Sequence, residues 1–577
     1  MATLAGALFC MMLIPSSKHP FSYKRMLLTG DASVLVSFGL ASLLYALFLI
    51  DSIEQNGLLF MGGLLAFLSV VFIGSAKLRL DARLVYAVIF GILGLGLYCV
   101  YQNPGSSHFG IASTVYGLCV LTALAALILA RSKSAATIGY RFFSQPEVII
   151  ISFFAAFAAI GAILLQMPLA QAQSAPHPFV DSFFTAMSAV CVTGLIVLDT
   201  PVDFSLFGQG VILMLIQVGG IGIVSLSAWV LFVFQSKRLS IHHEQAITEL
   251  SAYKHSISPK QMIKRILAYF FAFEMVGAFV LFFAFMNMGD GGAKAAWRAI
   301  FTAISAFCNA GFAIQSDSLI PYQSSFLVMF TISLLIIAGG FAPLLVLGLP
   351  KKKFRRWSLQ EKISIFTTLI LLSAGTILFL LLEWGHSMND LGTMEKLSNA
   401  WFQSVTTRTA GFNSVDLTAM RDVTTIFFMM LMFVGGNPGS AAGGIKTVTA
   451  AVIFFATVSA LRSGKEVRAF SRSIRVEVVN KAIAIAILGL ATGFFAYLTL
   501  AMTQQIETIP LLFETVSALG TVGLSLGVTG SLDGVGKIII IFCMLAGRVG
   551  PVTFVLTLLR NTPQSKWEVP QEDVYVS

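Results

Sequence analysis

Four short segments interrupt the hydrophobic stretches of this chain, and each closes with a glycine. They align without gaps as FTAMSAVCVTGL (184–195), FTAISAFCNAGF (301–312), WFQSVTTRTAGF (401–412) and FETVSALGTVGL (513–524). Glycine and threonine weaken a helix, so each segment predicts a short helix that stops near its glycine. Inside a membrane, backbone that leaves the helix is tolerated only where protein buries it or where it lines a water-filled path. A chain with four such breaks is therefore not expected to form a plain bundle of spanning helices.

The composition places these segments in a membrane. Hydrophobic residues make up 57% of the 577 residues and charged residues only 11%, whereas soluble domains carry roughly 25% charged residues. The chain is therefore predicted to be an all-α polytopic membrane protein, because a helix satisfies its own backbone in lipid. In such a chain the net charge of +10 indicates basic cytoplasmic loops rather than a partner nucleic acid. The six cysteines show no paired spacing, which argues against a disulfide framework and against a zinc site.

One unit recurs four times from residue 145 onward. In each unit a long apolar segment precedes the short segment, and a second apolar segment follows it. The first spans are expected near 147–167, 265–287, 363–384 and 480–502, and the second spans near 208–234, 325–349, 424–460 and 535–559. Such a period is too long for a solenoid and indicates a duplicated membrane unit. We therefore predict four membrane–pore-loop–membrane repeats in a pseudo-fourfold arrangement.

About four extra transmembrane helices are expected ahead of the repeats, near 32–50, 57–75, 84–101 and 111–130. Each of these apolar segments has about the length that a spanning helix needs. The predicted organisation is an N-terminal helical region at 1–140, pore repeats at 145–240, 262–350, 360–462 and 478–562, and a cytoplasmic tail at 563–577.

The basic residues indicate the topology. We place the N-terminus inside, let each long segment cross once, and let each short segment dip into the membrane and return. Most of the 37 Lys and Arg residues then fall in inner loops, including KKKFRR at 351–356 and the stretch 462–481. The positive-inside rule predicts this distribution, so both termini are expected to be cytoplasmic. The opposite loops carry carboxylates that should attract cations, namely Asp181, Asp199, Asp203, Asp290, Asp317, Asp416 and Asp422.

The short segments have the chemistry of a cation filter. The C-terminal end of each short helix carries a partial negative charge, which favours a cation at the middle of the membrane. The residues that follow can turn their carbonyl oxygens inward to replace the hydration shell of an ion, and glycine permits the backbone angles that this needs. The fourth segment reads Thr521-Val522-Gly523, the first part of the potassium-channel filter sequence. The alternative is that small residues merely let helices pack closely, and four gapless alignments argue against it.

With these motifs the chain resembles the Ktr/Trk/HKT superfamily of potassium translocation subunits over about residues 145–560. The stretches SAVCVTGL, TTRTAGFNS and GGNPGSAAGGIKT are most similar to the Ktr-type membrane subunit. The resemblance implies a filter lined by Val192, Thr193, Gly194, Asn309, Ala310, Gly311, Thr409, Ala410, Gly411, Thr521, Val522 and Gly523. A serine at the first closing position goes with sodium transport in plant relatives, so four glycines imply potassium selectivity. The N-terminal 140 residues depart from the pattern, because the Ktr type resembles the core alone and the Trk type adds two helices.

A glycine-rich stretch, VGGNPGSAAGGIKT (434–447), interrupts the second span of the third repeat. Its glycines and its proline will not hold a continuous helix, which predicts a flexible plug below the filter. A phosphate-binding P-loop is the alternative, but Ile445 separates Gly444 from Lys446 and no soluble strand precedes the glycines. In the family the matching segment acts as an intramembrane gate. The resemblance therefore implies the gate residues Gly435, Gly436, Gly439, Gly443, Gly444, Lys446 and Arg548.

Other polar residues lie within or beside the apolar segments. Arg548 is costly at membrane depth unless it faces water or a partner. The resemblance implies a place near the gate loop and the pore, and the alternative is that it bonds carbonyls freed beside Pro551. Arg408 is expected to brace the filter from behind, because a cation in the path would repel the ion. Glu274, midway in a span, is expected to pair with a base or to face a crevice. The stretch His242-His243-Glu244 is interpreted as a solvated turn or a partner contact rather than a metal site.

The predicted function is potassium uptake by a channel-like membrane subunit that is not an enzyme and has no cofactor of its own. By the resemblance, the chain forms a homodimer in a bacterial inner membrane and binds a cytosolic ring of nucleotide-binding regulatory (RCK-type) subunits. Potassium is the expected transported ion, sodium is a candidate activator, and a nucleotide is expected only on the partner. Alternatives are the ion-binding subunit of a potassium-pumping ATPase and a sodium-transporting relative. A sodium-coupled secondary transporter is disfavoured because inverted repeats would be expected.

Overall fold

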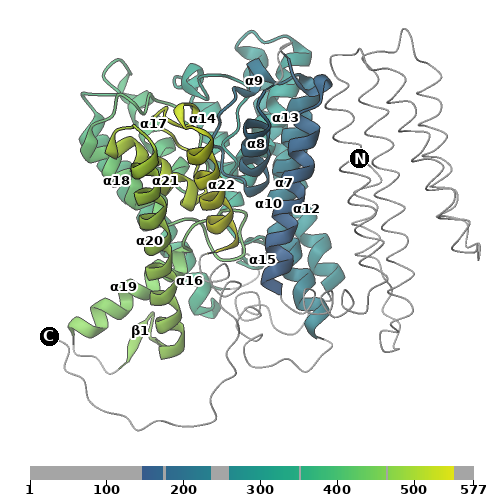
Figure 1. Cartoon of the computed structure of the whole chain (residues 1–577). Helices are drawn as coiled ribbons and strands as arrows, with labels where there is room; N and C mark the ends of the chain where they lie inside the picture. Colours follow the sequence, from purple (N-terminus) through teal and green to yellow (C-terminus); the bar gives the residue numbers. More distant parts are fainter. Residues whose placement is uncertain (1–145, 173–176, 236–258, 350–352, 463–465, 551–577) are drawn as a thin grey trace, which may run out of the picture. The chain divides into compact units, whose positions relative to one another are not determined.

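A computed structural model describes residues 146–172, 177–235, 259–349, 353–462 and 466–550 of the chain (Figure 1). The helices expected before residue 140, the stretch His242-His243-Glu244 and the tail at 563–577 lie outside the described residues.

The chain divides into two compact units. One comprises Met1–Gln145 with Met167–Pro176, and the other comprises Pro146–Gln166 with His177–Ser577. The described part of the first unit contains the helical turn η2 (Pro168–Ala170). The elements discussed below all belong to the second unit.

The described residues of the second unit are mostly helical, and their helices follow one order four times. A long helix comes first: α7 (Pro146–Leu165), α12 (Pro259–Asn287), α16 (Leu359–Glu383) and α20 (Val476–Thr503). A shorter helix follows: α8 (Phe179–Cys191), α13 (Gly292–Cys308), α17 (Thr393–Thr406) and α21 (Thr508–Gly520). Further apolar helices complete each stretch: α10 (Leu206–Gln235), α14 (Phe326–Gly339) with α15 (Pro343–Gly348), α18 (Asp422–Phe433) with α19 (Thr447–Leu461), and α22 (Gly534–Val549). Short connecting elements are α9 (Thr200–Asp203), η4 (Ile320–Tyr322), η6 (Phe354–Arg356), η7 (Thr529–Ser531), β1 (Val467–Ala469) and β2 (Arg472–Ile474).

Three of the described helices are long and apolar enough to cross a membrane, judged by length and composition: residues Lys264–Asn287 of α12, α16 and α20. Their outward faces carry large apolar side chains, such as Phe279, Leu381 and Met502, each more than 60% exposed. Apolar surface of this extent favours lipid over water as the surrounding solvent.

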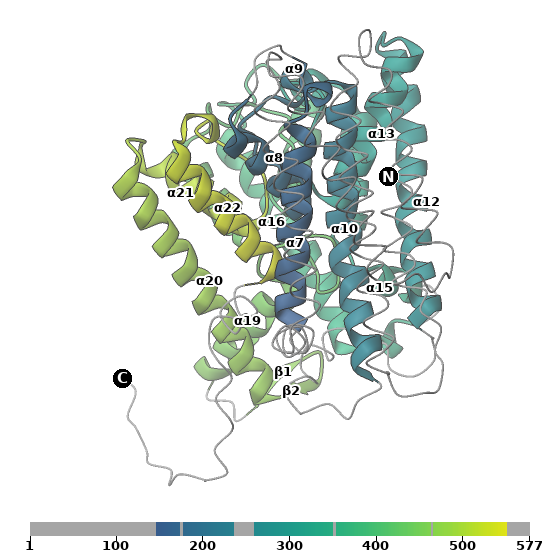
Figure 2. The same cartoon turned by 45° about the vertical axis from the view of Figure 1, so that its right-hand side comes forward.

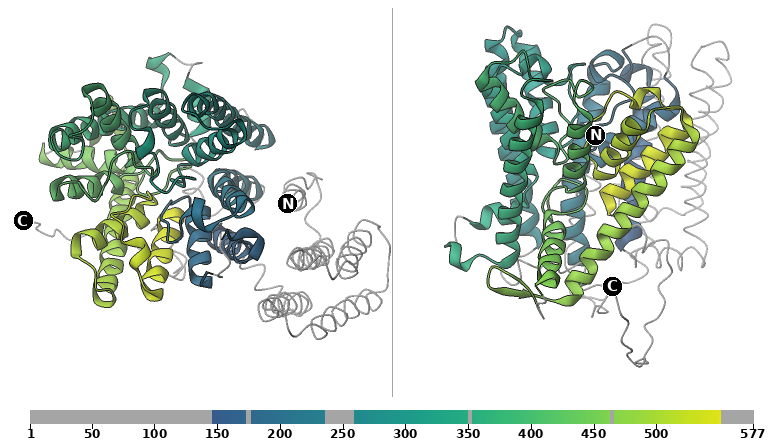
Figure 3. Two further views of the ribbon diagram at one scale, coloured as in Figure 1. Left: turned by 90° about the horizontal axis from the view of Figure 1, so that it is seen from above. Right: turned by 90° about the vertical axis from the view of Figure 1, so that its left-hand side faces the viewer.

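The second apolar helix of each stretch contacts the short helix of the next. Helix α10 packs against α13, α14 against α17, and α18 against α21, and α22 returns to pack against α8. Seen from above, the last helices (yellow) accordingly lie beside the first (blue) (Figure 3, left). Figure 2 shows α7 beside α10 and α20 beside α22, which agrees with their packing contacts. These contacts close the chain into a ring with the short helices as its inner members.

The short helices are the buried elements of this ring. From Phe184 to Cys191 in α8 every residue is buried, and so is each residue from Ser305 to Cys308 in α13. Large side chains such as Phe154 and Phe307 fill the space between the long and short helices in one continuous cluster. The packing therefore fixes the end of each short helix in the interior.

The second span expected near 325–349 consists of two helices with a break between them. Helix α14 ends at Gly339, and α15 begins at Pro343. Proline lacks the amide hydrogen that a continuing helix would need, and glycine lowers helix stability just before it. The break expected at 434–447 is present, because α18 ends at Phe433 and α19 begins at Thr447. Both breaks matter for the site, since the two irregular stretches contact each other.

The strands β1 and β2 form a small antiparallel hairpin after α19, with Val467 opposite Ile474. The hairpin packs against α19. Exposed arginines, Arg468 and Arg472, give its surface a positive charge.

Candidate ion pathway

Each short helix ends beside a residue with a left-handed backbone. Val192, Asn309 and Thr521 cap α8, α13 and α21 with φ values of 57°, 61° and 48°. Thr409, soon after α17, has φ 69°. Residues with a side chain rarely adopt these angles, and such strain persists only where the surrounding structure enforces it. At four aligned positions the fold thus turns the chain sharply out of a helix.

The closing glycines and the neighbouring carbonyls form a ring. Each glycine has a positive φ and lies against the carbonyl oxygen of the middle residue in the next segment. A Cβ atom added to the glycine would lie 2.4 Å from that oxygen for Gly194 and Ala310, 2.8 Å for Gly311 and Ala410, 2.5 Å for Gly411 and Val522, and 2.1 Å for Gly523 and Thr193. Real Cβ atoms do not approach oxygen so closely, so only glycine fits. The structure therefore brings all the predicted filter residues together, and ion binding by them stays a prediction.

Several polar oxygens around the ring have no partner. The Oγ1 atoms of Thr193, Thr409 and Thr521 are buried and make no hydrogen bond within the described part of the chain. Buried hydroxyl groups are normally paired. Backbone carbonyl and hydroxyl oxygens are the ligands that a hard monovalent cation prefers. Among the described residues, no group of three or more His, Cys, Asp or Glu side chains could hold a metal ion.

Hydroxyl side chains brace each segment from behind. Ser188 and Ser517 accept hydrogen bonds from the amide nitrogens of Gly194 and Gly523, each at 3.1 Å. In the other two segments the hydroxyl donates instead: Ser305 to the carbonyl of Phe312 at 2.7 Å, and Thr406 to that of Phe412 at 2.6 Å. These four residues are not among those predicted from the sequence. Their common signal is a Ser or Thr five or six residues before each closing glycine.

Glycines on the second helices allow these helices to pack closely against the ends of the short helices. A Cβ on Gly219 of α10 would lie 2.0 Å from the carbonyl oxygen of Val190. The corresponding distances are 1.8 Å for Gly339 and Phe307 and 2.0 Å for Gly547 and Leu519. All three carbonyls lie two residues before the left-handed residue, so the same close approach recurs in three stretches.

Gly219→Ala is expected to destabilise the protein by about 1–3 kcal/mol, because the methyl group overpacks a rigid backbone contact. Thermal unfolding in detergent measures the effect. Gly210→Ala is the matched control on the same helix, because no atom lies within 4 Å of its added Cβ. Equal melting temperatures for the two variants would contradict the close approach.

The glycine-rich stretch between α18 and α19 closes on itself. Val434 and Ile445 form an isolated parallel bridge, and the amide of Gly435 donates to the carbonyl of Ile445 at 2.8 Å. The amide of Thr447 donates to the carbonyl of Gly436 at 3.1 Å. The two ends of the stretch therefore meet, and we call residues 434–447 the gate loop.

The gate loop is fastened to the break after α14. The amide of Asn437 donates to the carbonyl of Gly340 at 3.0 Å, and the amide of Ala441 donates to that of Gly339 at 3.2 Å. The side chain of Asn437 also donates to Gly340 and accepts from Thr447 at 2.6 Å. A small set of hydrogen bonds therefore anchors the loop to the break after α14, and its flexibility stays a prediction.

Three cations donate to carbonyl oxygens of the gate loop. Arg408 reaches Gly435 at 3.1 Å, and Lys446 reaches Ala442 at 2.6 Å. Buried Arg548 donates through one terminal nitrogen to the carbonyl of Ala441 and through the other to that of Gly219 on α10 at 2.8 Å. Arg548 thus lies beside the gate loop, the first of its two expected places. Arg408 is likewise buried where it contacts the loop, and its place behind the filter stays a prediction.

The gate loop also touches the ring of carbonyls. A Cβ on Gly443 would lie 2.0 Å from the Oγ1 atom of Thr521, and one on Gly444 would lie 3.3 Å from the carbonyl oxygen of Gly520. The loop therefore lies directly against the fourth segment, and movement of the loop changes the surroundings of Thr521.

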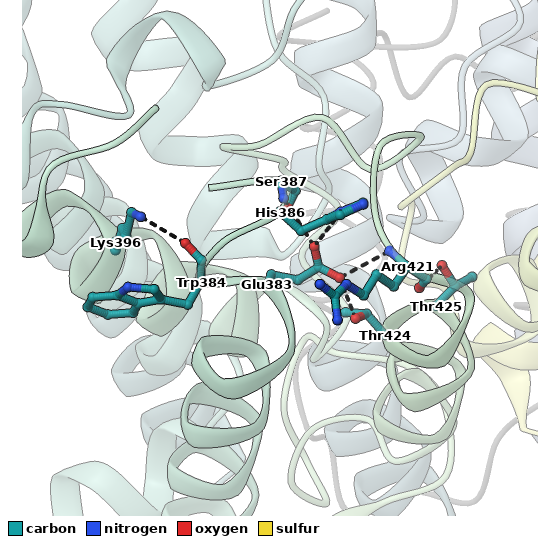
Figure 4. Close-up of polar contacts among 8 residues, drawn as sticks. All are labelled: Glu383, Trp384, His386, Ser387, Lys396, Arg421, Thr424 and Thr425. Atoms are coloured by element: carbon teal, nitrogen blue, oxygen red, sulfur yellow. Dashed lines mark hydrogen bonds and ion pairs between the residues drawn. The ribbon is translucent and has the colours of Figure 1, made fainter. Parts of the chain in front are cut away.

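A buried carboxylate joins α16 to α18 (Figure 4). Glu383, at the end of α16, accepts hydrogen bonds from the amide of Arg421 at 3.0 Å and from the hydroxyl of Thr424. Its other oxygen accepts from the amide of Ser387 at 3.2 Å and lies 3.3 Å from the Nδ1 atom of His386. These bonds fix the start of α18 and so the approach of the chain to the gate loop.

Acidic residues gather in the loops that follow the first two short segments. Burial raises the pKa of Asp199, a hydrogen bond from Ser316 lowers it, and the charges of Asp203 and Asp317 raise it further. Lys537 pairs with Asp181. Carboxylates gathered at one end of the ring make that end attractive to cations.

Comparison with known proteins assigns a family to this arrangement. Residues 110–569 match the model of the TrkH family, described as a cation transport protein. The chain belongs to the TrkH family. Among its relatives in that family is the Ktr system potassium uptake protein B of Bacillus subtilis, 35% identical over 75% of this chain and 97% of that protein. The protein of the same name from Vibrio alginolyticus is 36% identical over 73% of this chain and 92% of that protein.

Two other TrkH family comparisons bear on the fold and on the ion. The potassium/sodium uptake protein NtpJ of Enterococcus hirae is 34% identical over 74% of this chain and 97% of that protein. A crystal structure of the potassium transporter TrkH from Vibrio parahaemolyticus matches with a TM-score of 0.61 and 16% identity, covering 93% of this chain and 99% of that one. At that identity the match concerns the fold. Membership of this transporter family makes the chain a multi-pass membrane protein and not an enzyme.

Proposed function

We propose that this chain is the potassium-translocating, channel-like subunit of a Ktr-type uptake system. The observation that carries the proposal is the ring in which each closing glycine lies against a carbonyl of the next segment. Carbonyl oxygens held in such a ring can replace the hydration shell of a potassium ion. The names of the Bacillus and Vibrio relatives, potassium uptake proteins, support the same ion.

The ring is proposed to arise from four pore repeats in a pseudo-fourfold arrangement. Two observations support this: the cyclic packing of second helices on short helices, and the recurrence of one glycine–carbonyl contact in three stretches. In the third stretch the second helix and the short segment are joined differently: the side chain of Arg408 donates a hydrogen bond to the carbonyl of Gly435. The helix gives way there to the gate loop.

The gate loop is proposed to control the path. It touches Thr521 of the filter and is tied to the surrounding helices through Arg548 and Asn437. A segment with a few defined contacts can have two arrangements, and a partner that favours one of them shifts the population. Control by the loop therefore needs only modest binding energy from outside the chain.

The assembly is proposed to be a homodimer in a bacterial inner membrane, with both termini cytoplasmic. A regulatory ring of nucleotide-binding RCK-type subunits would dock on the basic inner loops, as the Ktr name of the relatives suggests. No cofactor is assigned to this chain, and any nucleotide would lie on the partner.

A second candidate is transport of sodium together with potassium. The name of the Enterococcus relative, a potassium/sodium uptake protein, favours it. Glycine at all four closing positions favours potassium selectivity instead, because a filter with uniform carbonyl geometry suits one ion size.

Uptake into proteoliposomes tests the function. The purified chain is expected to take up K⁺ and Rb⁺ down a gradient, faster than Na⁺, without ATP hydrolysis by a co-purified chain. Equal rates for K⁺ and Na⁺ would favour the second candidate. Strict dependence on a P-type ATPase would overturn the proposal in favour of a pump subunit.

A further inference from the structure

One buried carboxyl group takes no part in the proposed filter or gate. Glu274 lies in the middle of α12 with 4% of its surface exposed. Gln217 of α10 donates through Nε2 to both of its oxygens, at 3.0 and 3.1 Å. The thiol of Cys308 lies 3.9 Å from Oε1 of Glu274 and 3.8 Å from Oε1 of Gln217. We call these three side chains the Glu274 cluster. Its partners are an amide and a thiol, neither of them the base that the sequence suggested.

The Glu274 cluster lies directly behind the second filter segment. Cys308 is the last residue of α13, and the next residue is Asn309. A Cβ on Gly220 would lie 2.6 Å from the sulfur of Cys308, so α10 is packed against the same sulfur. The cluster therefore holds the end of α13 between α10 and α12.

The same part of α10 also receives the arginine that contacts the gate loop. Gly219 lies between Gln217 and Gly220, and its carbonyl accepts a hydrogen bond from Arg548 at 2.8 Å. Three residues of α10, Gln217, Gly219 and Gly220, thus meet the Glu274 cluster, the filter and the arginine that contacts the gate loop. A displacement of this part of α10 would move the second filter segment with it.

The fold itself does not require a polar group at this place. Gly277, three residues after Glu274, approaches Leu335, and Gly161 approaches Leu215 in the same way, with added Cβ atoms at 2.6 and 2.5 Å. Because Ala158 lies three residues before Gly161, this match aligns Glu274 with Ala158. The glycines of the other long helices, Gly375 and Gly493, likewise follow an apolar residue at this spacing, Leu372 and Leu490. Only the second stretch has a carboxyl group there. A buried carboxyl group is costly unless hydrogen-bonded, so its presence calls for a role beyond packing.

We propose that Glu274 is a positioning residue for ion selection. Through Gln217 and Cys308 it fixes the segment Asn309 to Gly311, so that the carbonyl of Ala310 keeps its place in the ring. Without this hold the second segment relaxes, and the ring accepts the smaller sodium ion more readily. The inference rests on the proposed function, because it concerns the residues assigned there as the filter.

Three variants of the full-length protein test the role in proteoliposomes: Glu274→Ala, Glu274→Gln and Gln217→Ala. The KM and maximal rate of K⁺ and Na⁺ uptake are measured separately, together with the melting temperature. Glu274→Ala and Gln217→Ala are each expected to lower the preference for K⁺ over Na⁺ about threefold or more, the usual size of such indirect effects. Glu274→Gln is expected to restore most of it, since its amide oxygen still accepts from Gln217. The double variant Glu274→Ala/Gln217→Ala is expected to lose about as much preference for K⁺ as either single variant, because both changes remove the same hydrogen bonds.

Glu361→Ala is the matched control. Glu361 is also 4% exposed, but it belongs to the capping box at the start of α16. It is expected to lose stability while keeping the wild-type preference, which separates positioning from general damage.

Particular outcomes overturn the inference. An unchanged preference in Gln217→Ala, the milder change should Glu274→Ala not fold, contradicts it. A Glu274→Gln variant as defective as Glu274→Ala would show that charge matters rather than the hydrogen bonds. If these variants keep the wild-type preference while Gly194→Ser loses it, the positioning role fails and the filter is retained. If Gly194→Ser keeps it too, the filter assignment itself fails.

Discussion

Gly194→Ser is expected to lower the preference for K⁺ over Na⁺ by about tenfold, a loss of about 1.4 kcal/mol in discrimination. Gly194 has φ +93°, an angle that residues with a side chain rarely adopt, and its added Cβ would lie 2.4 Å from the carbonyl oxygen of Ala310. The first segment, the second segment or both must therefore shift. Because each closing glycine lies against the carbonyl of the next segment around the ring, a shift in one segment changes the spacing of the others. Uptake of K⁺ and Na⁺ into proteoliposomes measures the change.

Gly292→Ser provides the control for that experiment. Gly292 begins α13, and no atom lies within 4 Å of its added Cβ. This variant is expected to keep the wild-type preference and the wild-type rate. Should Gly194→Ser also retain both, the ring of glycines and carbonyls is not the selectivity filter.

Deleting Gly439 to Gly443 is expected to raise K⁺ flux in the absence of a regulatory partner by about tenfold, equivalent to about 1.4 kcal/mol in favour of the open state. The deletion removes Ala441, which accepts from Arg548, and Gly443, which lies against Thr521. Arg548→Ala is expected to act in the same direction but more weakly. Asn437 still fastens the loop to Gly340 in that variant.

Lys294→Ala is the control for Arg548→Ala, because Lys294 is a cation with a 70% exposed side chain. It should leave the flux without a partner unchanged. Selectivity should change little in either gate variant, since the ring is built from other residues. A deletion variant that folds, inserts into the membrane and shows lower flux with partner control intact would place the gate elsewhere.

Much of the fold follows from local sequence signals. The long helices α7, α12, α16 and α20 begin and end within a few residues of the apolar segments that predict them, because apolar length is a property of each segment alone. The ends of the short helices are also predictable from local sequence. A glycine at a fixed place marks the point where the helix must stop.

The tertiary contacts behind the filter could not be predicted in this way. The break between α14 and α15 depends on the gate loop, about a hundred residues later, whose amides donate to the freed carbonyls of Gly339 and Gly340. The partner of Glu274 lies 57 residues away on another helix. Periodicity and composition report which residues are apolar, and they carry no information on which buried polar groups meet.

The residue just before each left-handed residue differs among the four segments, which is possible because a single chain forms the whole ring. Cys191, Cys308, Arg408 and Gly520 occupy that position in the four aligned segments, and each has a different surrounding. In a pore assembled from four identical subunits, an arginine there would appear four times, and four guanidinium groups behind one filter would repel the permeating cation. A covalently joined ring can hold the arginine once, next to its gate loop, and use other residues in the remaining quarters. Under the proposed function, gene duplication followed by divergence would let one quarter of the ring specialise in regulation while all four quarters keep the glycines proposed to serve conduction.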